Sequence, residues 1–547
     1  MGIGRILFAI GIAAGARGAR AAAPAFPLID GLGQHRRPVT HCSPLAQRYF
    51  DQAMAFRDGF NRSCALKSLA VAEGLSPGCP MIHWAIALTY GPDINSPDLT
   101  PAHAAAAWRE WNEARALAPS ASPVERALIA ALGRRYAEPS PADRKPLDRA
   151  YADAMRAVWR EYPADGDVGA WFAEALMDLR PWDQWTADGR PEPGTAEVLA
   201  TLEAVMRIDP RHPYANHLYI HAVEASPHPE RALPEADRLE GLQPMLAHNV
   251  HMPSHIYIRV GRWQEAIDVN LAAVAAQRRL EALVGPPRPS LALYNAHNEH
   301  MLAYAAMMTG QSALAGTHIR AALACLPPEL GREDPVDVDY FESMPLEVRV
   351  RFGRWAEILA APPPADPAHP YTRAFARAAR AVAAAALGRI ALARAEQTAY
   401  RADAEQVPAA EPFGLNSARA VLAVVSPMVE GEIDVKSGQA AAGIGALRRA
   451  VAAEDALRYD EPPGWLIPVR QSLGAALLHQ GRLAEAEAVY RADLARLPRN
   501  GWSLFGLAQT LAQEGRGAEA AVVQAEFRAV WSRADIAIGA SCLCQAP

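Results

Sequence analysis

The sequence has very few lysines and no apolar run long enough to cross a membrane after its first residues. Only Lys67, Lys145 and Lys436 are lysines among 54 basic residues, and the formal net charge is −6 over 547 residues. A nucleic-acid-binding protein needs a dense basic face, so we expect no nucleic-acid partner. With 51% apolar and 21% charged residues, the composition is that of a folded chain and excludes general disorder.

Common catalytic motifs are missing as well. The sequence contains no glycine-rich phosphate loop, no His-Glu-x-x-His, no Gly-x-Ser-x-Gly and no Cys-x-x-Cys. Nucleotide binding, zincin-type proteolysis, serine-hydrolase chemistry and dithiol redox catalysis therefore have no support from local motifs.

The first 23 residues have the form of an export signal. Arg5 supplies a positive charge, Ile6 to Ala14 form a short apolar stretch, and Ala19-Arg20-Ala21 is a small-x-small cleavage site. The alternative, a membrane anchor, needs roughly 20 apolar residues. We therefore expect a periplasmic or secreted protein, with no membrane span after the signal is cleaved.

Six cysteines follow the expected signal, and an even number in an oxidising compartment permits disulfides. We expect pairing among the three N-terminal ones, Cys42, Cys64 and Cys79. Cys542 and Cys544, one residue apart near the C-terminus, suit the binding of a soft metal better than a mutual disulfide. Two idle thiols in a frayed tail are the alternative.

Internal repetition predicts the fold. Residues 467–500 and 501–534 match at a shift of 34 residues, with small and large apolar residues at helical spacing and a glycine between two helices. This tetratricopeptide pattern predicts an all-α solenoid of about ten to twelve helical hairpins. The expected turn glycines are Gly261, Gly310, Gly353, Gly388, Gly481 and Gly515.

Irregular inserts interrupt the repeats, and the pattern divides the chain into segments. The inserts are Gly91–Thr100, Arg180–Gly194, Gly285–Ser290, Pro327–Pro335 and Pro362–Pro370. The segments are the signal (1–23), N-terminal repeats with a Trp-containing insert (24–212), central repeats with a histidine cluster (213–330), middle repeats (331–458), and a C-terminal repeat pair with a Cys-x-Cys tail (459–547).

Eight of the sixteen histidines fall within residues 217–300. Apart from His228, which falls in a predicted turn, they stand three or four residues from a neighbour, a spacing that puts side chains on one helix face. These groups are His217 and His221; His248, His251 and His255; and His297 and His300. Counted from the hairpin turns, all seven and Glu224 fall at places that face the concave groove, so we expect them to meet in one patch.

A metal site explains this clustering better than hydrogen bonding alone, because clustered imidazoles repel when protonated and have too few mutual acceptors when neutral. Imidazole suits copper, iron and zinc. Ligands in an open groove leave room for substrate, so we expect a metal-dependent enzyme, with copper and oxidoreductase chemistry favoured over iron or zinc. Glu224 and Glu299 are the candidate catalytic carboxylates, and the substrate would be a small molecule or peptide.

Two other functions stay open. The groove could hold a protein or peptide in a periplasmic scaffold, or the chain could store or deliver metal, with Cys542 and Cys544 accepting the ion. Asn216 and Asn249 are candidate hydrogen-bond partners of the ligands. The insert Arg180–Trp185 is either a wall over the groove or a plug against the solenoid, and Asp460–Trp465 is a turn that favours repeat stacking over a site.

The sequence also resembles a group of exported bacterial tetratricopeptide proteins. The resemblance is carried by Asn216–Glu224, His248–Tyr257, Arg180–Trp185 and Tyr459–Trp465, and it extends over nearly the whole mature chain. It implies the helical-repeat fold and no reaction, because the group is largely uncharacterised. The Cys542-x-Cys544 tail departs from it.

Overall fold

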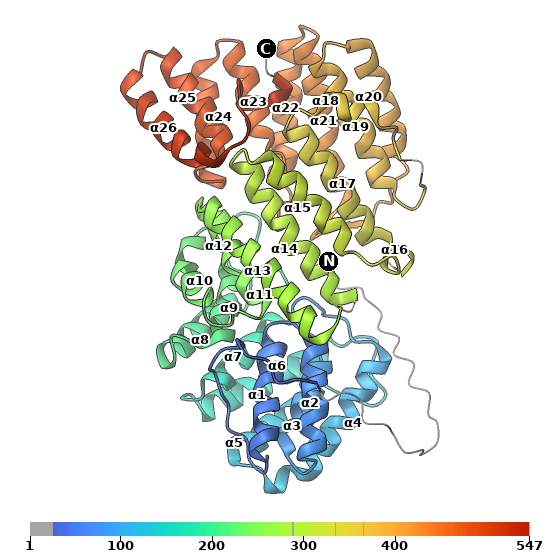
Figure 1. Cartoon of the computed structure of the whole chain (residues 1–547), viewed down its shortest axis with the longest axis vertical. Coiled ribbons are helices and arrows are strands. Elements are labelled where there is room, and N and C mark those ends of the chain that lie inside the picture. The colour runs from blue at the N-terminus through green and yellow to red at the C-terminus, as the bar shows by residue number, and fades with distance from the viewer. Residues whose placement is uncertain (1–25, 287–288, 334, 365, 546–547) are drawn as a thin grey trace. The chain divides into compact units, whose positions relative to one another are not determined.

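The computed structural model describes residues 26–286, 289–333, 335–364 and 366–545 (Figure 1). The expected export signal lies outside these residues. Within them helices dominate, and the strands are two-residue segments, β1 (Pro412–Phe413) and β2 (Asn416–Ser417), which pair antiparallel with Pro412 opposite Ser417. The predicted all-α fold is confirmed.

The chain divides into two compact units, which we describe separately. The N-terminal unit runs to Pro253 and adds Ala272–Leu291; the C-terminal unit comprises Ser254–Leu271 and the chain from Ala292 onward. Helix α13 (Trp263–Val284) contributes residues to both. The segment boundaries predicted from the sequence stay a prediction.

The N-terminal unit is built from short helices. They are α1 (Pro44–Asp58), α2 (Arg62–Leu75), α3 (Pro80–Tyr90), α4 (Pro101–Leu117), α5 (Pro123–Leu132), α6 (Lys145–Glu161), α7 (Gly166–Met177), α8 (Thr195–Ile208), α9 (Pro213–Val223), α10 (Leu233–Leu239) and α11 (Ala247–His251), with 3₁₀ turns at Ala118–Ser120 and Pro229–Ala232.

The C-terminal unit continues the pattern. Its helices are α12 (Pro253–Val260), α14 (Pro289–Met308), α15 (Ser312–Cys325), α16 (Leu330–Glu333), α17 (Pro335–Arg351), α18 (Trp355–Ala360), α19 (Pro370–Ala386), α20 (Ile390–Ala404), α21 (Ala418–Lys436), α22 (Ala440–Asp455), α23 (Val469–His479), α24 (Leu483–Arg496), α25 (Gly501–Gln513) and α26 (Gly517–Val530), followed by 3₁₀ turns at Trp531–Arg533 and Leu543–Gln545.

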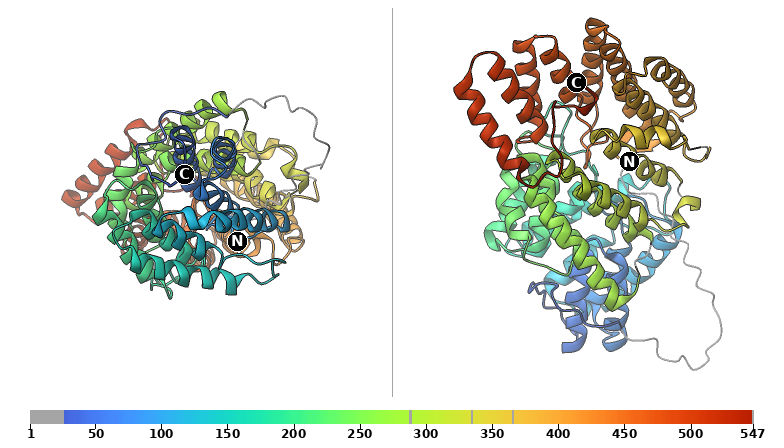
Figure 2. Two further views of the ribbon diagram at one scale, coloured as in Figure 1. Left: turned by 90° about the horizontal axis from the view of Figure 1, so that it is seen from below. Right: turned by 45° about the horizontal axis from the view of Figure 1, so that its top comes forward.

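Successive helices pack as hairpins in each unit, as the pairs α1–α2, α3–α4, α19–α20 and α21–α22 illustrate (Figures 1 and 2). All six predicted turn glycines have a left-handed backbone, with φ between +62° and +77°. A side chain is strained in that conformation, which explains the glycine at each turn. The predicted helical-hairpin solenoid is therefore confirmed.

Small residues let the helices of the last repeats approach closely. A Cβ atom on Gly474 would lie 2.4 Å from Cε1 of Tyr490, and one on Gly506 would lie 2.2 Å from Cζ of the same ring. Tyr490 is buried between them. The repeat therefore needs glycine at both positions, as the alternation of small and large residues predicts.

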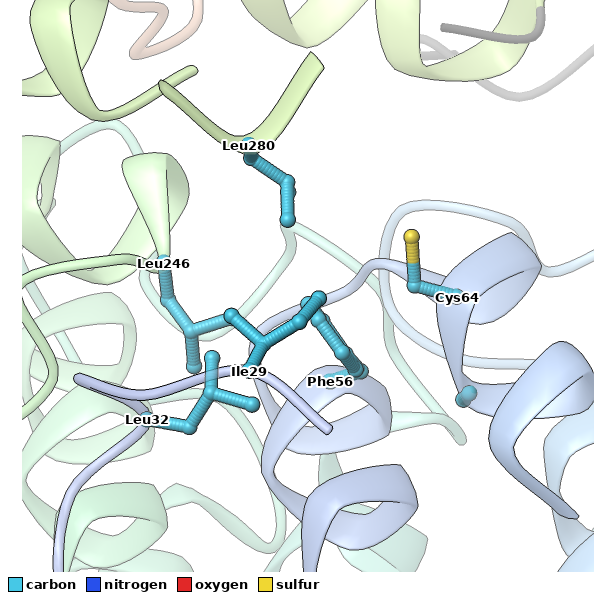
Figure 3. Close-up of a cluster of buried hydrophobic side chains, with 7 residues drawn as sticks. Ile29, Leu32, Phe56, Cys64, Leu246 and Leu280 are labelled. Carbon is cyan, nitrogen blue, oxygen red and sulfur yellow. The ribbon is translucent and has the colours of Figure 1, made fainter. Parts of the chain in front are cut away.

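A hydrophobic cluster fixes the start of the described chain in the N-terminal unit (Figure 3). Ile29 and Leu32 precede α1, Phe56 lies on α1, and they pack with Leu246 and with Leu280 of α13. Since Leu246 immediately precedes α11, this cluster holds the C-terminal end of α1 beside that helix.

Two sequence expectations about covalent and membrane features can be compared with the structure. Cys42 and Cys79 form a disulfide that closes a 37-residue separation, which confirms the expected pairing among the N-terminal cysteines. Among the described helices, none combines the length and apolarity required to cross a membrane.

Candidate metal centre

Helix α9 supplies the first two candidate ligands. It begins at Pro213, a residue suited to the first helical position, and the His212 side chain accepts a hydrogen bond from the Ala215 amide at its N-terminus. His217 and His221 therefore lie one turn apart, with ring centroids 5.0 Å apart, and both are buried. The predicted pair on one helix face is confirmed.

Helix α11 brings a third histidine to this pair. The His248 ring lies 4.9 Å from that of His217, and their Nε2 atoms are 3.2 Å apart. One ligand atom from each of the three histidines lies within 4.8 Å of the others. Because Nδ1–H of His217 donates to a carbonyl, its Nε2 accepts a hydrogen bond from Nε2–H of His248 in this structure. Nitrogens bound tetrahedrally to one ion at about 2.0–2.1 Å lie about 3.3 Å apart, so the same spacing also fits a shared ion that replaces this proton.

Hydrogen bonds set the tautomers of His217 and His221. The Nδ1–H of His217 donates to the Asp58 carbonyl oxygen at 3.0 Å, and the Nδ1–H of His221 donates to Oε1 of Glu224 at 2.9 Å. In a neutral imidazole the other nitrogen, Nε2, then carries the lone pair. This is the arrangement of metal-binding histidines, whose second nitrogen donates to a carbonyl or carboxylate.

Aromatic residues enclose the three rings. Phe60, just after α1, has its ring centroid 4.8 Å from that of His217 and 5.1 Å from that of His248. Its φ of +58° is left-handed, so the chain holds a strained backbone where the ring meets the histidines. Trp182 packs edge-on against His221 at 5.0 Å.

The Trp-containing insert lies against α9. The indole N–H of Trp182 donates to Asn95 at 3.0 Å, and that of Trp185 donates to the Ala222 carbonyl at 2.8 Å. The insert therefore packs against α9 beside His221, and the choice between a wall over the groove and a plug against the solenoid stays a prediction.

A second group of predicted residues lies in the C-terminal unit. The His255 and His297 rings are 5.7 Å apart, and Nδ1 of His255 pairs with the Glu461 carboxylate. The Tyr459 hydroxyl donates to the same carboxylate at 2.6 Å. The segment Asp460–Trp465 therefore supplies a buried acidic partner of a candidate ligand, besides a buried Trp465 that packs against Phe375. The sequence interpretation of this turn as a stacking feature did not include the contact of Glu461 with His255.

The remaining predicted residues have other neighbours. His251 lies beside His248, with centroids 6.0 Å apart. His300 packs edge-on against Tyr340 and Phe341, and burial lowers the pKa of His300 to about 3. The Glu299 carboxylate pairs with Nδ1 of His318, so any catalytic role for it stays a prediction.

Helices α11 and α12, which carry His248, His251 and His255, are separated by a single residue. Helix α11 ends at His251 and α12 begins at Pro253, and Met252 between them keeps a helical backbone with φ −49° and ψ −38°. Proline lacks an amide N–H and fits the first turn of a new helix. Asn216 and Asn249 likewise serve elsewhere, donating to backbone carbonyls at the start of α9 and to Gln243.

The structure also gathers His35, Asp167 and His212, which the sequence analysis missed because no two of them are close in sequence. Nε2 of His35 and of His212 contact Oδ1 of Asp167 at 2.8 and 3.2 Å. Since Nδ1 of His212 accepts from the Ala215 amide, its Nε2 bears the proton and donates to Asp167. This group is a hydrogen-bonded carboxylate, not a ligand set like the first.

Cys542 and Cys544 are joined as a disulfide. The expectation that their spacing favours metal binding over a mutual disulfide is therefore wrong for the oxidised chain. The alternative of a frayed tail fails too, because both residues are buried.

Comparisons with known proteins add little. No model of a known protein family and no curated protein matches the chain. Among solved structures, the human IFIT1 dimer with PPP-AAAA is 13% identical over 90% of this chain and 91% of its own, with a TM-score of 0.34. The P58(IPK) TPR domain is 11% identical over 86% and 98%, at 0.24, and yeast Tom70 is 10% identical over 86% and 89%, at 0.27. Similarities this weak carry no conclusion about function.

Proposed function

We propose that this chain is a metal-dependent enzyme whose His217, His221 and His248 imidazoles bind one transition-metal ion. The observation that carries the proposal is the convergence of three buried histidines whose ligand atoms lie within 4.8 Å of one another. Two of them already donate their Nδ1–H to a carbonyl and a carboxylate, so the Nε2 lone pairs are oriented without a metal.

The donor set favours copper, followed by zinc and iron. Imidazole nitrogen suits all three metals, and the affinity of a given site for divalent ions is highest for copper. Structural zinc sites are usually closed by four ligands, many of them thiolates, and stacked helical hairpins need no such crosslink. Three histidines leave a coordination position for a substrate, which suits a catalytic ion.

Glu224 takes a positioning role in this proposal. Its carboxylate contacts Nδ1 of His221 and is itself buried, so it fixes the orientation of that imidazole and raises its basicity as a ligand. A small-molecule or peptide substrate would bind to the ion itself. Copper favours oxidation of such a substrate. Export to an oxidising compartment is part of the proposal, supported by the Cys42–Cys79 disulfide.

A scaffold that binds a protein or peptide partner is the rival function, favoured by the helical solenoid alone. A metal-storage protein is a second rival function. Elemental analysis by mass spectrometry distinguishes the scaffold from the proposed enzyme. The sample is the full chain, purified without a metal-affinity column. We expect one metal ion per chain at this site, lost in His217→Ala and in His248→Ala.

The matched control is His228→Ala, because His228 is exposed and pairs only with Glu230 among the described contacts. We expect it to keep the ion. If the purified protein holds no metal and takes up neither Cu²⁺ nor Zn²⁺ on titration, the proposal is overturned and the scaffold remains. A bound ion with no turnover of any oxidisable substrate would favour storage.

A further inference from the structure

The C-terminal tail is built into the C-terminal unit. The turn Leu543–Gln545 lies against α19, α21 and α23. The Ser541 hydroxyl donates to the Gln471 carbonyl at 2.8 Å and contacts the Tyr490 hydroxyl at 2.7 Å. Gln471 lies on α23 and Tyr490 on α24, so Ser541 joins the tail to two helices of the unit.

This position places both tail sulfurs beside a buried carboxylate. Sγ of Cys544 lies 3.2 Å from Oε1 of Glu432, and one ligand atom from each of Cys542, Cys544 and Glu432 lies within 4.8 Å of the others. All three residues are less than 7% exposed. The other oxygen of Glu432 accepts a hydrogen bond from the Gln545 side-chain amide, which orients the carboxylate.

We propose that reduction of the Cys542–Cys544 disulfide opens a second metal site, in which the two thiolates and the Glu432 carboxylate bind a soft or borderline divalent ion such as Zn²⁺. A thiolate at about 2.3 Å and a carboxylate oxygen at 2.0–2.2 Å from one tetrahedral ion lie about 3.6 Å apart. The sulfur–oxygen distance of 3.2 Å needs only a small adjustment to reach that value.

Reduction of the Cys542–Cys544 disulfide requires an external reductant, such as a dithiol. The dithiol gives two electrons and two protons to the disulfide, so two cysteine thiols form and the dithiol becomes a disulfide. Binding of the ion then releases both thiol protons, since thiolates are the ligands. Burial raises the pKa of the Glu432 carboxyl to about 7, and a bound cation would stabilise its charged form.

This site is independent of the histidine centre, and Co²⁺ distinguishes the two because only sulfur ligands give intense thiolate-to-cobalt absorption. We would titrate Co²⁺ into the full chain before and after reduction with a phosphine that is then removed. The absorption is expected only after reduction, with Zn²⁺ displacing the cobalt. His217→Ala should not change it.

Three variants test the ligands. Replacing both Cys542 and Cys544 by serine should abolish the absorption, which also excludes a contribution from reduced Cys42 and Cys79. Glu432→Gln keeps the shape of the side chain and should weaken binding at least about tenfold, as loss of an outer partner alone costs that much. Glu430→Gln is the matched control, since Glu430 lies on the same helix α21, pairs with Arg449 at 2.8 Å and supplies no ligand to the proposed site.

Absence of the absorption in the reduced wild-type chain would overturn the proposal. So would its persistence in the double serine variant, which would place the thiolate ligands elsewhere. Unchanged affinity in Glu432→Gln would refute the three-ligand site. Circular dichroism of each variant checks that the fold is intact.

Discussion

The buried carboxylate of Asp167 should be a major contributor to the stability of the N-terminal unit. It accepts hydrogen bonds from His35 at 2.8 Å, from Arg37 at 2.9 Å and from His212 at 3.2 Å. Burial alone would raise the pKa of Asp167, but the hydrogen bonds from His212 and His35 and the charge of Arg37 outweigh it and hold that pKa well below its usual range. The carboxylate is therefore charged in the folded chain at any ordinary pH.

Asp167→Asn keeps the side-chain shape and removes the charge. Removing one member of a buried ion pair costs about 3–5 kcal/mol. We expect the lower limit, about 3 kcal/mol, because Arg37 keeps a second carboxylate partner, Asp165, at 2.8 Å. The asparagine amide keeps only one acceptor oxygen, so it cannot accept from Arg37 on one side and from His35 and His212 on the other, and part of the cost comes from there.

The cost should depend on pH in a defined direction. Burial lowers the pKa of His35, but the hydrogen bond and charge of Asp167 raise it above its usual value overall. The His35 contribution is therefore complete below about pH 6.5 and is lost as the pH rises through the folded pKa. The Asp167 contribution is complete above about pH 4 and is lost at lower pH, as the folded pKa is approached. The loss in Asp167→Asn should be largest between these limits.

Urea unfolding of wild type and Asp167→Asn at pH 5.5 and pH 8.5 measures this loss, and hydrogen exchange in α7 and α9 assigns it to the N-terminal unit. A double-mutant cycle with His35→Ala isolates the pair. A loss below about 1 kcal/mol, the range of exposed ion pairs, would refute the reasoning. So would a larger loss at pH 8.5 than at pH 5.5.

Two more outcomes follow from contacts in the same unit. Replacing Cys42 and Cys79 by serine should lower the free energy of unfolding by about 4 kcal/mol, because the disulfide closes a 37-residue separation and so restricts the unfolded chain. Urea unfolding of the wild type with and without reductant measures this loss. Equal unfolding midpoints would contradict the prediction. Glu224→Gln should weaken metal binding about 10- to 100-fold, because the neutral amide orients His221 less well than the carboxylate does, and the circular dichroism should not change. Competition with a chelator measures the dissociation constant of the ion. An unchanged constant would show that Glu224 does not support the site.

The predictable part of the fold depends mostly on residues that are close together in the sequence. The turn glycines are visible in the sequence because a left-handed backbone selects glycine at one fixed place in each hairpin. His217 and His221 are predictable for a similar reason, since four residues make one helical turn whatever surrounds the helix. Features of this kind depend on neighbours in sequence and need no knowledge of tertiary contacts.

Counting places along each repeat predicts that His217, His221 and His248 meet, and in the N-terminal unit they do. The count does not give the packing that brings them together. Leu246, which immediately precedes α11, packs with Ile29 and Phe56 from the start of the described chain. Contacts between residues so far apart in sequence leave no periodic signal.

The hydrogen-bond and ring partners of His217 are the least predictable part of the candidate site. Its Nδ1–H donates to a backbone carbonyl, that of Asp58, and backbone carbonyls leave no mark in a sequence because every residue has one. Phe60 reaches the same ring from 157 positions away in the numbering, through a left-handed backbone where a sequence would suggest glycine. A strained phenylalanine persists only where its contacts compensate for the strain. The contacts of its ring with His217, His221 and His248 are therefore the interactions that compensate for the strained backbone of Phe60.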